Sequence, residues 1–92
     1  MLDDLADVFA RVRTWDAVVE KKIGLYYLRR TPFLHFHVLR SGRVADARDG
    51  HTWGARIDLP YPSTAARRRA LLRELRARYE RTLAPTPDGG GR

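Results

Sequence analysis

The residues of this chain best suited to chemistry are His35 and His37, which stand two positions apart in a segment rich in apolar residues. If the segment is a strand, both imidazoles project from the same side, about 6–7 Å apart at the backbone. A histidine oriented by a carboxylate can act as a general acid or base. We expect Asp46 on a neighbouring strand to orient His37, which makes His37 and Asp46 the catalytic candidates.

The same side chains suit two other chemistries. Two histidines and a carboxylate form a set that binds iron, zinc or manganese, but catalytic metal sites usually have three firm protein ligands. Here the third ligand would be Asp46, whose position depends on the inferred strand register. His51 is a possible fourth ligand, but it lies in a turn. We therefore favour a cross-strand polar pair and predict neither a metal nor another cofactor. Arg48 or Arg56 could hold a phosphate or carboxylate beside it.

A central strand over 33–39 would position the histidines. This stretch contains aromatic and β-branched residues, its even positions Leu34, Phe36 and Val38 are all apolar, and turn residues flank it. Ser41-Gly42 predicts a two-residue hairpin turn, so that the chain returns over 43–48 and His37 pairs with Asp46. This register puts His35, His37, Asp46 and Arg48 on one face, and a core set on the other: Leu34, Phe36, Val38, Ala45 and Ala47.

The last strand is expected over 53–59, after a turn that begins at Asp49-Gly50. An odd number of loop residues makes one face of the sheet apolar throughout, and such consistency sets register. We therefore expect an odd loop, with Trp53, Ala55 and Ile57 on the core side. Arg56 and Asp58 then point to the histidine side.

Helices are predicted at both ends of the sheet. Residues 2 to 13–15 and 64–83 each carry an apolar stripe at helical spacing, and Ser63 is the expected N-cap of the second helix. Residues 25–28 form a strand by composition, while 16–24 suit either a turn or a strand. The predicted fold is α+β, in the order α-β-β-β-β-α: an antiparallel meander of three to four strands with both helices on one face. We expect one domain over 1–84 and a flexible tail over the Pro/Gly-rich stretch 85–92.

Composition narrows the functional classes. The chain has 92 residues and no cysteine, which excludes disulfides and thiol nucleophiles, and no apolar run is long enough to span a bilayer. We expect a cytoplasmic protein with no membrane partner. The net charge is +7, yet residues 1–20 hold four Asp and one Glu against two Arg, whereas 63–84 hold seven Arg against two Glu. If the terminal helices are neighbours, part of this charge is neutralised internally.

The basic segment PSTAARRR (62–69) nevertheless offers Arg67, Arg68 and Arg69 at a helix N-terminus, where backbone amides also favour phosphate. The α-β-β-β-α order is similar in outline to double-stranded-RNA-binding domains. The GPxH-like loop and KKxAK-like helix start that carry RNA contacts in that family are absent from this chain, so the resemblance covers topology alone.

The open sheet face mixes aromatic, cationic and apolar groups, as protein contact surfaces do. We expect a small interaction domain that uses this face, through Phe33, His35, Arg48 and Arg56, for self-association as a homodimer or for another partner. The alternative is a nucleic-acid (RNA) binding domain, with metal-independent phosphodiester cleavage by His37 and Asp46 as an optional further activity. Whether the protein is an enzyme stays open at this point.

Overall fold

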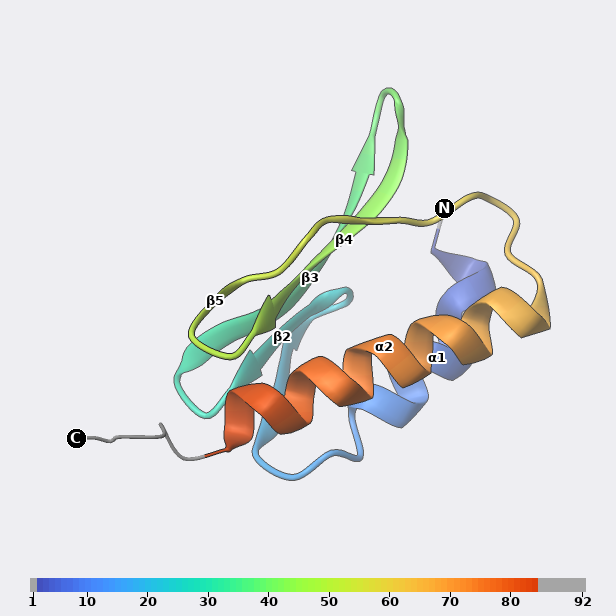
Figure 1. Ribbon diagram of the computed structural model, residues 1–92. Helices are drawn as coiled ribbons and strands as arrows, with labels where there is room; N and C mark the ends of the chain where they lie inside the picture. The colour runs from blue at the N-terminus through green and yellow to red at the C-terminus, as the bar shows by residue number, and fades with distance from the viewer. Residues whose placement is uncertain (1, 85–92) are drawn as a thin grey trace.

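The computed structural model describes residues 2–84, so the tail predicted over 85–92 lies outside the described residues. A one-turn 3-10 helix leads directly into the first α-helix, and a second α-helix closes the described chain (Figure 1). The elements, in order, are η1 (Asp3–Leu5), α1 (Ala6–Val12), β1 (Val18–Lys22), β2 (Leu25–Leu28), β3 (Thr31–Leu39), β4 (Gly42–Asp49), β5 (Thr52–Trp53), β6 (Ile57–Asp58) and α2 (Ala65–Leu83).

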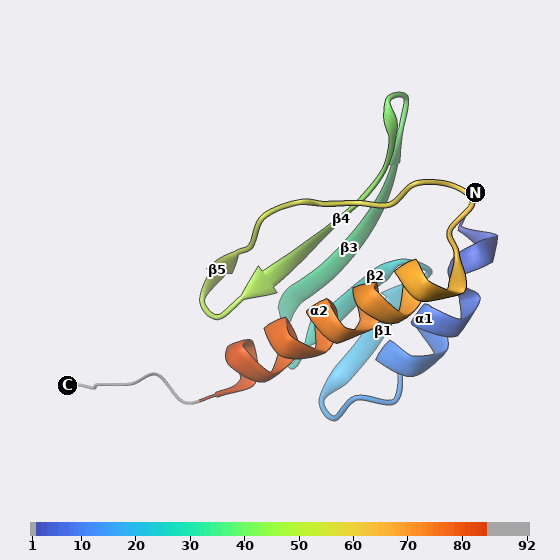
Figure 2. The same cartoon turned by 45° about the vertical axis from the view of Figure 1, so that its right-hand side comes forward.

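The strands form one antiparallel meander in the order β1-β2-β3-β4-β5, and β6 also pairs with β4. Both helices lie side by side on one face of this sheet, and the other face is left open (Figures 1 and 2). The predicted α+β class and helix placement are therefore confirmed. The segment left undecided at 16–24 supplies the edge strand β1, which turns into β2 at Gly24, where φ is +84°.

The core lies between the helices and the covered face of the sheet. Each helix turns its apolar stripe inward, and the inward residues of β2, β3 and β4 meet it, because alternate strand residues share a face. Phe9 of α1 contacts Phe36 of β3 edge to face, with ring centroids 5.0 Å apart. The buried apolar residues shared among these elements include Leu5, Val8, Phe9, Val12, Tyr26, Leu34, Phe36, Ala45, Ala47, Leu71, Leu75 and Tyr79.

The hairpin between β3 and β4 departs from the predicted register by two residues. Leu39 pairs with Gly42, so the turn is Arg40-Ser41 rather than Ser41-Gly42, and His35, not His37, lies opposite Asp46. A register shift of two residues leaves every side chain on the same face of the sheet. The two histidines and Asp46 therefore lie on the open face, as expected. Val38 faces the helical side, but it is 46% exposed because the hairpin tip extends beyond both helices (Figure 1).

The expectation that Phe33 lies on the open face is wrong. Tyr26 pairs with Leu34 and Tyr27 with Pro32, so Phe33 is an extra residue at a bulge in β3. Bulges redirect a side chain in this way. Phe33 is fully buried, with its ring centroid 6.1 Å from that of Tyr79 on α2, and it cannot contact a partner.

The turn after β4 is also shorter than predicted. Arg48 pairs with Trp53, and the chain reverses through Gly50-His51, where Gly50 adopts φ +77°. The even loop places Trp53 on the open face, 46% exposed, rather than in the core. The register then shifts by one residue before β6, so that Ile57 lies opposite Ala45 and packs against the core as expected.

Helix α2 begins at Ala65, one residue later than the start at 64 that an N-cap at Ser63 predicts. Thr64 is the N-cap, and its hydroxyl accepts a hydrogen bond from the Arg67 backbone N–H at 3.1 Å. Ser63 instead donates its backbone N–H and hydroxyl to Asp4, at 2.8 and 2.6 Å. The predicted N-cap at Ser63 is therefore wrong, because the Ser63 side chain is hydrogen-bonded to Asp4 instead of to the helix backbone.

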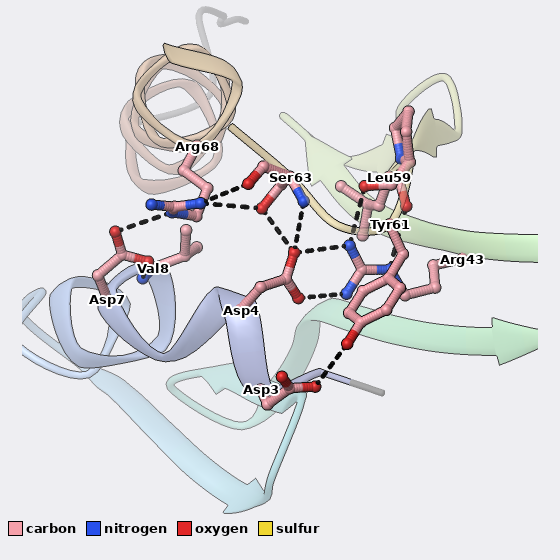
Figure 3. A network of polar contacts seen from close by, with 10 residues as sticks. Asp3, Asp4, Asp7, Val8, Arg43, Leu59, Tyr61, Ser63 and Arg68 are labelled. Carbon is pink, nitrogen blue, oxygen red and sulfur yellow. Dashed lines mark hydrogen bonds and ion pairs between the residues drawn. The ribbon is translucent and has the colours of Figure 1, made fainter. Parts of the chain in front are cut away.

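A buried ion pair fastens the N-terminal turn to the sheet and to the segment before α2 (Figure 3). The Arg43 guanidinium donates to both carboxylate oxygens of Asp4, at 2.6 and 3.1 Å, and its side chain is 2% exposed. It also donates to the carbonyls of Leu59 and Pro60, and the Tyr61 ring lies 4.7 Å away. These contacts satisfy a charge that burial would otherwise make costly.

In residues 2–84, neither helix is long and apolar enough to cross a membrane.

Candidate functional site on the open sheet face

His35 and His37 lie side by side on the open face of β3, with ring centroids 3.9 Å apart. The Nε2 atom of His37 lies 3.2 Å from an Asp46 carboxylate oxygen on β4. This contact is diagonal across the strands, because Asp46 is directly opposite His35. The structure therefore brings together the three polar residues that the sequence pattern grouped, through a register different from the predicted one.

Arg56, which follows the short strand β5, completes this cluster. Its guanidinium donates to both carboxylate oxygens of Asp46, at 3.0 and 2.8 Å. These hydrogen bonds lower the pKa of Asp46, and the contact with His37 lowers it further. Asp46 is thus a carboxylate at neutral pH, held from two sides and able to orient the His37 ring.

His35 differs from a solvated histidine. Partial burial lowers its pKa below the ordinary value of 6.5, and the neighbouring His37 and Lys22 charges lower it further. A neutral His35 has one ring nitrogen that donates and one that accepts. His35 therefore presents a neutral imidazole at neutral pH, beside the charged Asp46 and Arg56.

A second cluster lies at the β4–β5 turn. The Arg48 guanidinium is 4.8 Å from the Trp53 ring, and its Nε atom donates to the Pro32 carbonyl at 2.6 Å. At the opposite edge of the sheet, the ammonium group of Lys21 on β1 lies 5.1 Å from the ring of Tyr27 on β2. Sequence reasoning missed Trp53, and the turn dipeptide Gly50-His51 is the signal that could have placed it correctly.

The described residues do not support the metal hypothesis. Within residues 2–84, no group of three or more His, Asp or Glu side chains is arranged to hold a metal ion. His51 sits in the turn after β4, where its carbonyl accepts from Arg48 at 3.3 Å.

The three arginines predicted to bind nucleic acid are not equivalent. Arg68 is bound to Asp7 of α1 at 3.0 Å and to the Ser63 carbonyl at 2.7 Å, so the terminal helices do neutralise part of each other's charge. Arg67 and Arg69 are exposed. All three lie on α2, across the sheet from the histidines, and they do not share a site with them.

The fold and this face define an open-faced antiparallel α+β domain. Comparison with known proteins gave no match to a family model, a curated protein or a solved structure.

Proposed function

We propose that this protein is an interaction domain and that its open sheet face binds a partner, in the simplest case a second copy of the chain. The observation that carries the proposal is the uncovered face itself. Val19 and Trp53 are 48% and 46% exposed on it, beside Tyr27, His35 and Arg48. Aromatic residues and arginine are the types enriched in protein interfaces.

The face is a better contact surface than the free edge of the sheet. The edge strand β1 carries Lys21 and Lys22, and its register with β2 is interrupted between Glu20 and Lys22. Charged residues and bulges of this kind protect edges against pairing with another strand. Two-fold pairing of identical faces would instead cover Trp53 and Val19 in both copies and satisfy the common symmetry of dimers.

Sedimentation velocity from low micromolar to several hundred micromolar protein tests the proposal. We expect a concentration-dependent dimer, weakened about tenfold by Trp53→Ala, the size of a central interface contact. Ile23→Ala is the matched control, because Ile23 is 73% exposed in the β1–β2 turn. A wild-type protein that stays monomeric throughout, or equal effects of the two substitutions, would contradict self-association through this face.

A second candidate function rests on the 3.2 Å contact between His37 and Asp46. RNA lying on the face could be cleaved without a metal: His37 takes the proton of a 2′-hydroxyl, and the resulting oxygen attacks the adjacent phosphorus. The bond to the 5′-oxygen breaks, solvent returns a proton to that oxygen, and a 2′,3′-cyclic phosphate forms. Cleavage of a labelled RNA in the presence of chelator should be lost in His37→Ala and kept in His51→Ala. No cleavage by the wild-type protein would remove this candidate.

A further inference from the structure

We propose that the groove between α1 and α2, on the side away from the open sheet face, binds the phosphate backbone of nucleic acid. The groove has a volume of about 470 Å³ and is lined by residues that include Arg11 and Trp15 from the α1 end of the chain and Arg73 and Arg76 from α2. The two helices that form it lie side by side in both views (Figures 1 and 2). This proposal does not depend on the one made for the sheet face.

Three exposed arginines in and beside this groove have charges that the described part of the chain does not neutralise. Arg11 lies on α1, and Arg69 and Arg73 are one helical turn apart on α2; none of their side chains pairs with a carboxylate within residues 2–84. Four other arginines of α2 pair with carboxylates: Arg68 with Asp7, Arg76 with Glu80, Arg78 with Glu74 and Arg81 with Asp49. The unpaired positive charge of these three arginines therefore lies along one stripe of α2 and on the neighbouring α1.

Arg76 places a guanidinium in the groove beside Glu80, which also lines it. The Arg76 guanidinium lies 5.4 Å from the Trp15 ring and 4.9 Å from the Tyr79 ring, and its Nε atom donates to Glu80 at 2.9 Å. Stacked on rings and tied at one end, the guanidinium is held in place before a ligand arrives. Trp15 is half-buried and lines the groove at the same place, so its ring supports the Arg76 guanidinium there.

The chemistry of the groove favours nucleic acid over a lipid surface. Arginine recognises phosphate with paired, planar donors, and all the cations of this stripe are arginines. Helices that bind membranes insert large apolar side chains into the bilayer. The large apolar residues exposed in the described chain all lie outside α1 and α2, on strands and turns: Val19, Ile23, Val38, Leu39, Trp53 and Tyr61.

Fluorescence anisotropy with a labelled oligonucleotide, single-stranded and duplex, tests the proposal across a range of salt concentrations. We expect wild-type binding to weaken steeply with salt, and the double variant Arg11→Gln/Arg73→Gln to bind about tenfold more weakly. Its slope of log affinity against log salt should be shallower by about 0.7–0.9 for each phosphate that the variant no longer neutralises. Neither side chain makes a hydrogen bond or ion pair within residues 2–84, and an unchanged circular dichroism melt would confirm that the variant folds.

The control is Arg30→Gln/Arg40→Gln, which removes the same charge from two exposed positions in turns of the sheet. It should bind within about twofold of the wild-type protein, since these positions lie outside the groove. Equal loss in both double variants would show a general charge effect and overturn the proposal. Absence of oligonucleotide binding at low salt would do the same, as would equally tight binding to phosphatidylserine vesicles with the same dependence on Arg11 and Arg73.

Discussion

Arg43 of β4 and Asp4 of η1 are joined by two hydrogen bonds, of 2.6 and 3.1 Å, although they are far apart in the sequence (Figure 3). Their side chains are 2% and 12% exposed. Asp4 also accepts two hydrogen bonds from Ser63, just before α2. One carboxylate therefore links the N-terminal turn, the sheet and the start of the long helix.

The first prediction concerns this carboxylate. Asp4→Asn should lower the free energy of unfolding at neutral pH by about 3–5 kcal/mol, because it leaves the Arg43 charge buried without its counterion. Chemical denaturation measures the change. Asp7→Asn is the control: Asp7 pairs with Arg68 at 3.0 Å but is 60% exposed, and its loss should cost less than about 1 kcal/mol. Similar losses in the two variants would contradict a special role for Asp4.

The pH dependence of stability follows from the same contact. The hydrogen bonds from Arg43 hold the pKa of Asp4 far below its ordinary value of 3.8. The unfolded chain therefore takes up a proton before the folded one, and the stabilisation is present above the ordinary pKa and is lost as the pH falls toward the lowered one. Unfolding followed from pH 7 to pH 2 should show a steeper loss in the wild-type protein than in Asp4→Asn. Parallel curves would mean that Asp4 does not titrate as inferred.

The assignment of the two sheet faces predicts opposite outcomes for neighbouring residues. Phe36 is 4% exposed and packs on Phe9, so Phe36→Ala should cost about 3–5 kcal/mol of stability by emptying a core site. His35→Ala should change stability by only about 0.5 kcal/mol, since its side chain points to the open face. Thermal and urea unfolding of both variants measures the difference, and a reversed order would refute the face assignment.

A side chain at position 54 should displace the Arg78 guanidinium from its buried contact. The Gly54 backbone N–H donates to the Ala47 carbonyl at 2.8 Å, and a Cβ atom there would lie 2.5 Å from the buried Arg78 guanidinium, which donates to the same carbonyl. We expect Gly54→Ala to destabilise the fold by about 1–3 kcal/mol. Combined with Arg78→Ala it should add less than its single cost, because the clash is then relieved. Full additivity would show that the two residues are independent.

The lowered pKa of His35 is open to direct measurement by NMR titration. Its imidazole should titrate below 6.5, and His37→Gln should raise its pKa only in part, because burial is the larger cause. A folded-state pKa below that of the unfolded chain means that His35 reduces stability as the pH falls from about 6.5. A His35 that titrates at or above the ordinary value would contradict the described packing of the two rings.

The α+β class was readable from the chain because periodicity alone decides it. Apolar residues recur at helical spacing at both ends and alternate around Phe36, and neither pattern depends on distant contacts. The same alternation placed His35, His37 and Asp46 on one face. An error of two residues in the hairpin turn left that grouping intact, since the side-chain period in a strand is two.

Tertiary structure decided where the local rule of alternation breaks. The bulge that buries Phe33 and the two-residue turn that exposes Trp53 each change the parity of a single position, and packing against Tyr79 and Arg48 selects them. The ion pair of Asp4 with Arg43, and the groove lined by Arg11 and Arg73, arise from residues distant in sequence. No periodicity encodes such pairs, because they exist only once the helices have docked on the sheet.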